Sequence, residues 1–320
     1  MNKNIAIIAG EPRSINSEII AKSWRIIKKN QKKNIFVIGN FVLLKKQLSI
    51  LKIKIPIKKI NNINTKSSIK YLKVFDVPFK FKKPFEKKNK ETSRYILKCF
   101  DIAHNLAMKK LIKGFINCSI DKKNTFGKKN MGVTEFLAKK NKIQGKEIML
   151  IFNKNLSVVP LTTHIAIKNV AKKISYNFIK NKIYNLNAGY FSVFKKKPRI
   201  AVLGLNPHNG EHRPDTEEEK IIIPVIKFLK KNKYKINGPF SSDTFFASNK
   251  NVKYDIILGM YHDQVLTPFK TIFKFDACNI TLGLKYLRVS PDHGTGEDII
   301  GKKKANPLSL IKSIDFISNI

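Results

Sequence analysis

Cysteine is scarce in this sequence, and the few cysteines form no recognisable pattern. The three that occur among the 320 residues, Cys99, Cys118 and Cys278, are widely separated. This spacing excludes both a disulfide framework and a zinc ribbon. No apolar run approaches the roughly 18 residues of a membrane-spanning helix, and the apolar run near the N-terminus is too short for a signal peptide. We therefore expect a soluble, cytoplasmic protein without a membrane partner.

Acidic residues and arginines are also few, whereas lysine is abundant. Lys and Arg together number 63 against 22 Asp and Glu, which gives a formal net charge of +41. Such a charge is typical of nucleic-acid-binding proteins. Only six of the basic residues are arginines, however, and readers of nucleic acid favour the bidentate guanidinium group. Lys, Ile and Asn share A/T-rich codons, so genomic bias is the preferred interpretation and a polyanionic partner the weaker one.

Glycine-rich loops that bind phosphate groups are absent. The first apolar run, residues 5–9, is expected to be a strand, and it ends in the turn Gly10-Glu11-Pro12. Arg13 and Ser14 follow this turn, where a dinucleotide-binding fold would have spaced glycines. No strand is followed by a Gly-Lys-Ser or Gly-Lys-Thr turn. These absences disfavour a standard Rossmann cofactor site and exclude a P-loop.

Short β-branched runs alternate with longer amphipathic segments along the chain. Strands are expected at residues 5–9, 34–39, 147–152, 156–160, 199–205, 254–260 and 279–282. Helices are expected to run to about residue 29, over 91–113, from about 165 to 183, from 216, and over 306–317. Residues 45–90 are lysine-rich and predict only an edge strand or two. The alternation predicts an α/β fold with a largely parallel sheet.

Three of the six histidines share one kind of position. His164, His208 and His262 each follow the carboxyl end of an expected strand. Ligands of open α/β sheets bind at that edge, so we expect the three imidazoles to converge there. Neutral imidazoles favour zinc or a neighbouring transition ion over magnesium, and three protein ligands leave a coordination position open for catalysis. The alternative, three unrelated loop histidines, stays open at this point.

Two further segments contain candidate ligand-binding residues. Arg288 is one of the few arginines, lies on an expected strand, and suits the bidentate capture of phosphate or carboxylate. The turn His293-Gly294-Thr295-Gly296 contains two glycines, which would let the backbone approach a ligand closely. Because Glu297 and Asp298 follow this turn, an ordinary helix start explains it equally well.

Several uncommon motifs are spread along nearly the whole chain. They are IAIIAGEP (5–12), GVTEF (132–136), LTTH (161–164), LGLNPHNGE (203–211), TEEEKIIIPV (216–225), GPFSSDTF (238–245), YDIILGMYHDQ (254–264), NITLGL (279–284) and DHGTGEDIIGKKKAN (292–306). In content and order they resemble the motifs of the 4-hydroxythreonine-4-phosphate dehydrogenase family of vitamin B6 (pyridoxine) biosynthesis. Residues 40–130 match this family only weakly.

The resemblance implies a two-domain α/β fold of the isocitrate/isopropylmalate dehydrogenase type, with an active-site cleft between the domains. Residues 1–130 and about 290–320 would form the first domain. Residues 131–289 would form the second, which contains most of the metal and substrate residues. The resemblance also implies a homodimer with shared active sites, and NAD or NADP bound without a Gly-rich fingerprint.

The resemblance further implies roles for individual residues. One divalent metal ion, with zinc expected before magnesium, cobalt or manganese, would bind His164, His208 and His262. Substrate binding is implied for Thr134, Lys270, Asn279 and Arg288, and cofactor binding for His293, Gly294, Thr295, Asp298 and Asn306. The expected catalytic residues are Asp243, Asp263 and Lys270, of which the two aspartates would transfer protons or orient metal ligands.

The sequence departs from the family pattern at two places. Val133 occupies the position of the histidine in the family's Gly-His-Thr-Glu, so a contact expected near the substrate phosphate is missing. The family's glycine-rich continuation after Gly-Glu-Pro is replaced by residues 13–17, Arg-Ser-Ile-Asn-Ser. Both departures bear on which substrate the protein takes.

The implied reaction is the NAD-dependent oxidation of 4-phosphooxy-L-threonine at its secondary hydroxyl. The resulting β-keto acid would lose CO2 to give 3-amino-2-oxopropyl phosphate. A bound metal ion would favour alkoxide formation and then stabilise the enolate. One alternative is a related dehydrogenase of another phosphorylated four-carbon hydroxy acid, such as threonate or erythronate phosphate. A second alternative is a non-catalytic, basic nucleic-acid-binding protein.

Overall fold

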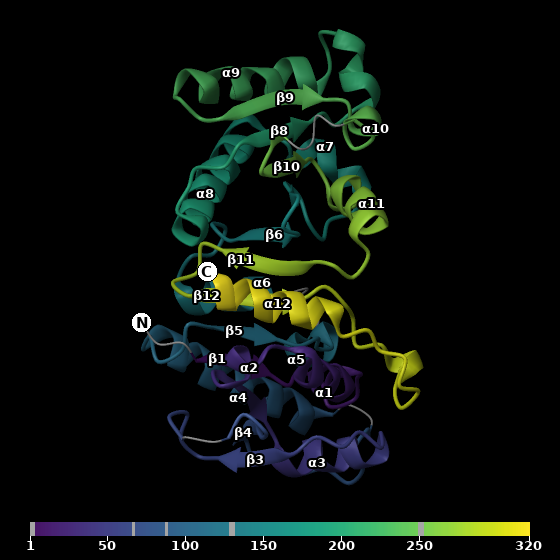
Figure 1. The fold of residues 1–320 in the computed structure, drawn as a ribbon. Helices are drawn as coiled ribbons and strands as arrows, with labels where there is room; N and C mark the ends of the chain where they lie inside the picture. Colours follow the sequence, from purple (N-terminus) through teal and green to yellow (C-terminus); the bar gives the residue numbers. More distant parts are fainter. Residues whose placement is uncertain (1–3, 66–67, 87–88, 128–131, 249–252) are drawn as a thin grey trace. The chain divides into compact units, whose positions relative to one another are not determined.

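The computed structural model describes residues 4–65, 68–86, 89–127, 132–248 and 253–320. These residues form two units, each of which contains neighbouring strands and helices (Figure 1). The first unit contains residues 1–142, 275–279 and 284–320, and the second contains 143–274 and 280–283. Strand β11 (Cys278–Leu282) therefore contributes residues to both units.

The described part of the first unit contains six neighbouring parallel strands. Their order is β3-β4-β2-β1-β5-β12. The strands are β1 (Ile5–Ile8), β2 (Ile35–Gly39), β3 (Ile57–Ile60), β4 (Leu72–Asp76), β5 (Gly114–Asn117) and β12 (Leu287–Pro291). Every residue of β1, β2 and β5 is buried, as expected for central strands of a parallel sheet that helices cover on both faces. Strand β3 at the edge is half exposed and carries Lys58 and Lys59.

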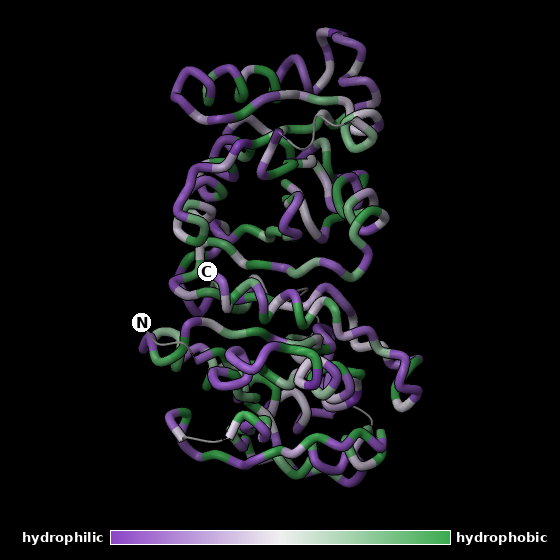
Figure 2. The backbone as a smooth tube through the Cα atoms, in the orientation of Figure 1, coloured by the Kyte–Doolittle hydropathy of each residue, from purple (hydrophilic) through white to green (hydrophobic). Residues whose placement is uncertain are grey.

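The described residues of the first unit include seven helices and one short 3-10 turn. They are α1 (Asn16–Ile26), α2 (Lys29–Lys32), α3 (Phe41–Ile50), α4 (Lys90–Met108), α5 (Lys122–Phe126), α6 (Val133–Asn141), η5 (Glu297–Ile299) and α12 (Leu308–Asn319). The apolar faces of α4 and α6 pack with β1, β2 and β5 into one core, to which Phe36, Phe100 and Phe115 contribute large buried rings. Figure 2 shows hydrophobic and hydrophilic colour alternating along the turns of α12, whose apolar side lies against β12.

In the second unit the strands follow the order β6-β7-β10-β8-β9, in which β6 runs antiparallel to β7 and the other pairs are parallel. The strands are β6 (Ile148–Phe152), β7 (Ser157–Pro160), β8 (Ile200–Leu203), β9 (Ile236–Phe240) and β10 (Ile256–Gly259). The helical segments are η1 (Ile167–Asn169), α7 (Val170–Lys173), α8 (Tyr176–Phe194), η2 (Pro207–His212), the π-helical turn η3 (Glu218–Ile222), α9 (Ile223–Lys231), α10 (Ser242–Phe245) and α11 (His262–Phe273). The predicted α/β class with largely parallel sheets is confirmed.

Two sequence predictions differ from the structure. The single helix expected up to about residue 183 is interrupted, because Ser175 has an extended backbone and its hydroxyl accepts the N–H of Phe178, which starts the new helix α8. The boundary expected at residue 130 lies instead near residue 142. Helix α6 belongs to the first unit because Val133 and Leu137 are buried in that unit's core. The segment 284–289 joins the first unit for a similar reason, since Tyr286 packs against the same core.

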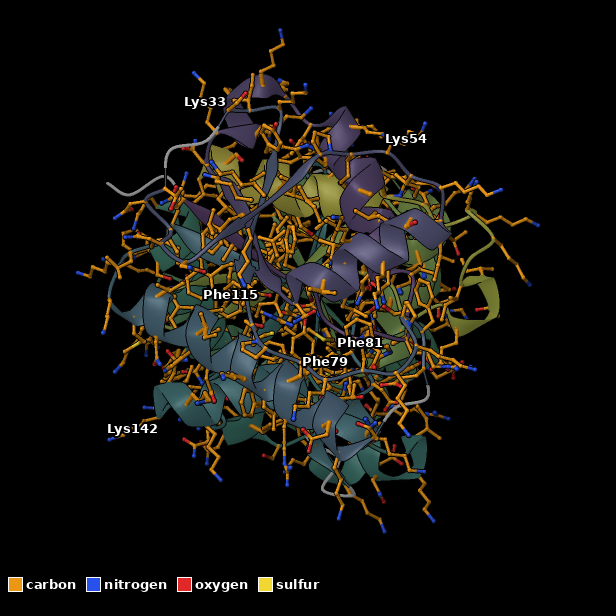
Figure 3. The ribbon with its side chains drawn as sticks, turned by 90° about the horizontal axis from the view of Figure 1, so that it is seen from below. Lys33, Lys54, Phe79, Phe81, Phe115 and Lys142 are labelled. Atoms are coloured by element: carbon orange, nitrogen blue, oxygen red, sulfur yellow. The ribbon has the colours of Figure 1, made fainter. Side chains whose placement is uncertain are left out.

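The excess lysines lie mainly on the surface. Figure 3 shows Lys33, Lys54 and Lys142 at the periphery with their side chains pointing outward, and all three are exposed. Phe115, labelled in the same view, is fully buried. Among the described residues, no helix is long and apolar enough to cross a bilayer.

Candidate active site

Three neighbouring parallel strands of the second unit lead into the loops that contain the expected metal ligands. Strands β7, β10 and β8 are adjacent and parallel, so their carboxyl ends share one edge of the sheet. His164 follows β7, His208 follows β8, and His262 is the first residue of α11, directly after β10. The strand topology therefore brings the three loops to one edge, where α/β sheets bind their ligands.

His164 and His262 lie side by side at this edge. Their ring centroids are 5.8 Å apart, a separation that suits two imidazoles bound to one ion, since metal–nitrogen bonds measure about 2.0–2.1 Å for zinc. His262 Nδ1 is 2.6 Å from Asp263 Oδ1. In the tautomer with hydrogen on Nδ1, the carboxylate accepts this hydrogen and leaves the Nε2 lone pair for a ligand. The spacing and this orientation are compatible with two imidazole ligands of one ion.

His208 stands apart from this pair and faces Asp243. Its Nδ1 is 3.8 Å from Asp243 Oδ2. The Ser241 hydroxyl donates to Asp243 Oδ1 over 2.6 Å, and this hydrogen bond, aided by His208, lowers the pKa of Asp243. In the part of the chain that the structure describes, no three His, Cys, Asp or Glu side chains are close enough to hold a metal ion. Imidazole ligands thus suit a transition metal. Of the three histidines, however, only His164 and His262 lie side by side, and His208 belongs to a neighbouring loop.

Gln264 connects the loops of this edge. Its side-chain Nε2 donates to the carbonyl of Gly204 over 2.6 Å and to the Ser242 hydroxyl over 2.7 Å. Its Oε1 accepts the backbone N–H of Met260 over 2.6 Å. Because Gly204 follows β8, Ser242 begins α10 and Met260 follows β10, this one nearly buried amide fixes three segments that carry site residues.

Arg288 is a buried cation of the first unit. Its side chain on β12 is 3% exposed, and its Nε donates to Asn117 Oδ1 on the adjacent strand β5 over 2.7 Å. Burial lowers the pKa of Arg288 to about 10, against the opposing influence of Tyr286 and Glu135. The guanidinium therefore stays charged at neutral pH and suits the capture of an anion.

The remaining residues expected to bind substrate lie in both units. Thr134 belongs to the first turn of α6, and Asn279 to the part of β11 in the first unit. The Oδ1 atom of Asn279 is buried and has no hydrogen-bond partner among the described residues, which fits an acceptor kept for a ligand. Lys270 is exposed in the last turn of α11, in the second unit.

The loop expected to bind the cofactor packs against α1. The Thr295 carbonyl accepts the N–H of Ile15 over 3.0 Å, and a side chain at Gly296, which has φ of 58°, would collide with Ile15. His293 Nδ1 is 2.9 Å from the carbonyl of Gly294, while its Nε2 is buried without a hydrogen-bond partner among the described residues. Burial lowers the pKa of His293, so the ring is neutral at physiological pH.

Two other members of this expected cofactor set have exposed positions. Asp298 lies in the short turn η5. Asn306 accepts the backbone N–H of Leu308 over 2.9 Å through its Oδ1 atom. This hydrogen bond satisfies a free amide at the start of α12, so Asn306 has a structural role whether or not it also contacts a cofactor.

Val133, where the family has histidine, is the first residue of α6. It is 6% exposed and belongs to the apolar core of the first unit. Valine can neither donate to nor accept from a substrate at this position, so any anionic group must be bound by other side chains of the unit.

Sequence reasoning missed Gln264 and Asn117. Gln264 lies two residues after His262 within the motif YHDQ, and this spacing was an available signal. Asn117 gave none, because its partner Arg288 is 171 residues away in the sequence.

Comparison with known proteins gives matches along the whole chain. The family model of the pyridoxal phosphate biosynthetic protein PdxA matches residues 31–317. A 4-hydroxythreonine-4-phosphate dehydrogenase of Sulfurihydrogenibium sp. (strain YO3AOP1) is 35% identical over 97% of this chain and 96% of its own length. The enzyme of the same name from Aquifex aeolicus is 35% identical over 100% of this chain and 99% of its own length.

Solved structures of like-named proteins agree with the fold. The 4-hydroxythreonine-4-phosphate dehydrogenase of Klebsiella pneumoniae superimposes with a TM-score of 0.85, at 27% identity, over 99% of both chains. The one from Burkholderia phymatum gives a TM-score of 0.81, at 26% identity, over 99% of this chain and 98% of the other. The resemblance inferred from the motifs is confirmed, and the chain belongs to the pyridoxal phosphate biosynthetic protein PdxA family.

Proposed function

We propose that this protein oxidises 4-phosphooxy-L-threonine at its secondary hydroxyl and passes the hydride to NAD or NADP. The β-keto acid then loses CO2 to give 3-amino-2-oxopropyl phosphate, a step of pyridoxal 5′-phosphate biosynthesis. The single observation that supports this most is the full-length match to dehydrogenases of that name. The presence of histidine in all three loops at the edge of the second unit agrees with it.

The histidines suit a divalent ion, with His164 and His262 as the closely spaced pair and His208 as the third ligand. Zinc is the first candidate, and magnesium, cobalt or manganese are alternatives. When bound, such an ion would supply Lewis acidity to the oxygen of the reacting carbon. Asp263 orients His262 by accepting hydrogen from Nδ1, and Asp243 stays ionised near His208 because the Ser241 hydroxyl stabilises its charged form.

The charged and amide side chains suit the two ends of the substrate. Arg288 offers a buried, rigid cation for a phosphate or carboxylate group, and Lys270 an exposed and flexible one. Asn279 has a buried acceptor for a substrate N–H or O–H group, and Thr134 would add a hydroxyl contact. Orientation by several such contacts lowers the entropic cost of reaching the transition state.

The cofactor, the assembly and the location follow from the same family membership. We assign NAD or NADP to the loop of His293, Gly294 and Thr295, together with Asp298 and Asn306. We also propose a homodimer with shared active sites and a cytoplasmic location. The neutral His293 ring with its buried Nε2 atom agrees with a cofactor contact in that loop.

A related reaction is the second candidate, and Val133 favours it. A protein without the family histidine at this position has lost one contact to an anionic substrate. A phosphorylated four-carbon acid such as threonate or erythronate phosphate would use the same hydride and metal chemistry. Binding of nucleic acid without catalysis is the outcome opposed to both, and a fall in duplex-DNA affinity with rising salt would reveal it.

The test is NADH formation by the purified full chain with 4-phosphooxy-L-threonine and with the two four-carbon acid phosphates, with and without a chelator. His208→Ala should abolish turnover, whereas His212→Ala is the matched control, because His212 lies in the same loop with its side chain 83% exposed and paired with Glu219. Absence of NAD and NADP reduction with every substrate would overturn the proposal. A turnover rate that neither the chelator nor His208→Ala reduces would overturn the assignment of the metal ligands.

A further inference from the structure

The loop of His208 has an unusual backbone. His208, Asn209, Gly210, Glu211 and His212 all have positive φ, between 50° and 66°. L-residues avoid this left-handed conformation, which only glycine adopts routinely, and the run contains one glycine. The intrinsic backbone preferences of these residues therefore do not stabilise this conformation, and contacts with the surrounding structure must stabilise it.

Glu218 holds the chain where it enters this turn. Its side chain is fully buried, at 0% exposure. One carboxylate oxygen, Oε1, accepts the backbone N–H of Leu205 over 2.6 Å and that of Asn206 over 2.8 Å. The other, Oε2, accepts the side-chain Nδ2–H of Asn206 over 2.8 Å. The carboxylate thus fixes the two residues between the end of β8 and the turn.

The position of Glu218 depends on a second irregularity. Glu218 is the first residue of the π-helical turn η3, which precedes α9. Such turns are rare and occur frequently at functional sites, because they re-aim side chains. Just before it, Thr216 packs so closely against Gly210 that any side chain at Gly210 would collide with it. The start of this helical segment therefore supports both the entry and the middle of the left-handed turn.

We propose that Glu218 is a positioning residue for His208. Its buried carboxylate fixes the backbone that leads into His208. It thereby positions the His208 imidazole to bind a metal ion together with His164 and His262. The inference rests on the proposed function in one respect, which is that His208 is a metal ligand. It assigns no contact between Glu218 and either metal or substrate.

The test is a Co²⁺ titration of the purified full chain, followed through the visible absorption bands of the bound ion. Glu218→Gln keeps the shape of the side chain. It replaces one acceptor oxygen with an NH₂ group, which cannot accept the N–H groups of Leu205 and Asn206. Supporting groups of this kind typically change metal affinity by about 10- to 100-fold, and we expect a loss in that range. Glu219→Gln makes the same chemical change one residue further on, where the side chain contacts the exposed His212, and should leave Co²⁺ affinity unchanged.

Asn206→Ala is the milder second variant, because it removes the side-chain contacts to Glu218 Oε2 and Glu217 Oε2 but keeps both backbone contacts to Glu218 Oε1. If Glu218→Gln does not fold, a reduced Co²⁺ affinity of folded Asn206→Ala supports the inference, and an unchanged affinity overturns it. If Glu218→Gln folds and binds Co²⁺ as the parent does, while His208→Ala binds it weakly, the inference fails and the metal assignment stands. If His208→Ala itself binds as the parent does, the metal assignment fails.

Discussion

Arg288 donates through Nε to Asn117 Oδ1 over 2.7 Å, and both side chains are 3% exposed. Asn117 in turn donates through Nδ2 to the Cys118 carbonyl over 3.2 Å, which fixes the orientation of its amide. A neutral amide satisfies one guanidinium N–H without cancelling the charge. The pair therefore holds a buried cation in one orientation, which is what recognition of an anion requires.

Replacement of Arg288 by lysine tests this relationship. Lysine keeps the charge but loses the planar donor group that meets Asn117. We expect KM for the phosphorylated substrate to rise by about tenfold or more, with a smaller change in kcat, because binding of the ground state and the transition state weakens alike. Steady-state kinetics measure both constants. The control is Arg199→Lys, since Arg199 is an exposed arginine that pairs with Asp255 in the second unit. Equal KM values for Arg288→Lys and the parent would contradict the role of Arg288.

Asp263→Asn tests the orientation of His262. An amide at this position can present its NH₂ group to Nδ1, which favours the tautomer with hydrogen on Nε2, the atom needed for the metal. We expect metal affinity to fall by about 10- to 100-fold, as measured by titration with Zn²⁺ in an isothermal calorimeter. Asp276→Asn, at a carboxylate that pairs with Lys312 in the first unit, is the control. Unchanged affinity in Asp263→Asn would show that the 2.6 Å contact does not set the tautomer.

Val133→His restores the residue type of the family pattern at a buried position. Because Val133 is 6% exposed, the imidazole would lose hydration without an assured partner, and the free energy of unfolding should fall by roughly 1–3 kcal/mol. Urea unfolding measures this change. Val42→His, at a valine on α3 that is 49% exposed, should change stability by less than about 0.5 kcal/mol. If the Val133→His variant is as stable as the parent, the imidazole must find a hydrogen-bond partner or water at this position, and the predicted cost of burial is wrong.

Asp255 should make the stability of the second unit depend on acid pH. Burial alone would raise the pKa of Asp255, but hydrogen bonds from Arg199 and Lys196 outweigh burial and lower the pKa to about 2. A carboxylate whose pKa is lower in the folded state stabilises the protein above its unfolded pKa, here near 4. This stabilisation is lost as the pH falls from about 4 towards 2.

Asp255→Asn removes that contribution. At neutral pH the variant should be less stable by roughly 1–2 kcal/mol, and the difference from the parent should shrink between pH 4 and pH 2. Urea unfolding at a series of pH values measures both effects. Asp276→Asn is again the control, because the ion pair of Asp276 with Lys312 has side chains that are 35% and 33% exposed and should contribute less than about 1 kcal/mol. A constant difference across the pH series would contradict the role of Asp255.

The strands β1, β2, β6, β7, β8, β10 and β11 could be predicted from the amino-acid sequence, because β-branched runs and their turns are local signals, whereas β5 and β9 were not predicted. The sequence also placed His164, His208 and His262 after strand ends, since that placement needs only the end of a strand and the next few residues. The stretch 45–90 is weakly patterned, and its strands β3 and β4 form only through pairing, β4 with β2 and β3 with β4.

Which of these residues come into contact depends on how whole strands and helices pack. The pairing of β5 with β12 brings Asn117 to Arg288 across 171 residues, and no local pattern encodes such a contact. The core of the first unit decided that α6 belongs there, and the π-helical turn decided that Glu218 would hold the loop of His208. The local hydrophobic periodicity of a strand or helix predicts which of its sides is buried. Contacts between side chains far apart in the sequence depend instead on how whole elements pack.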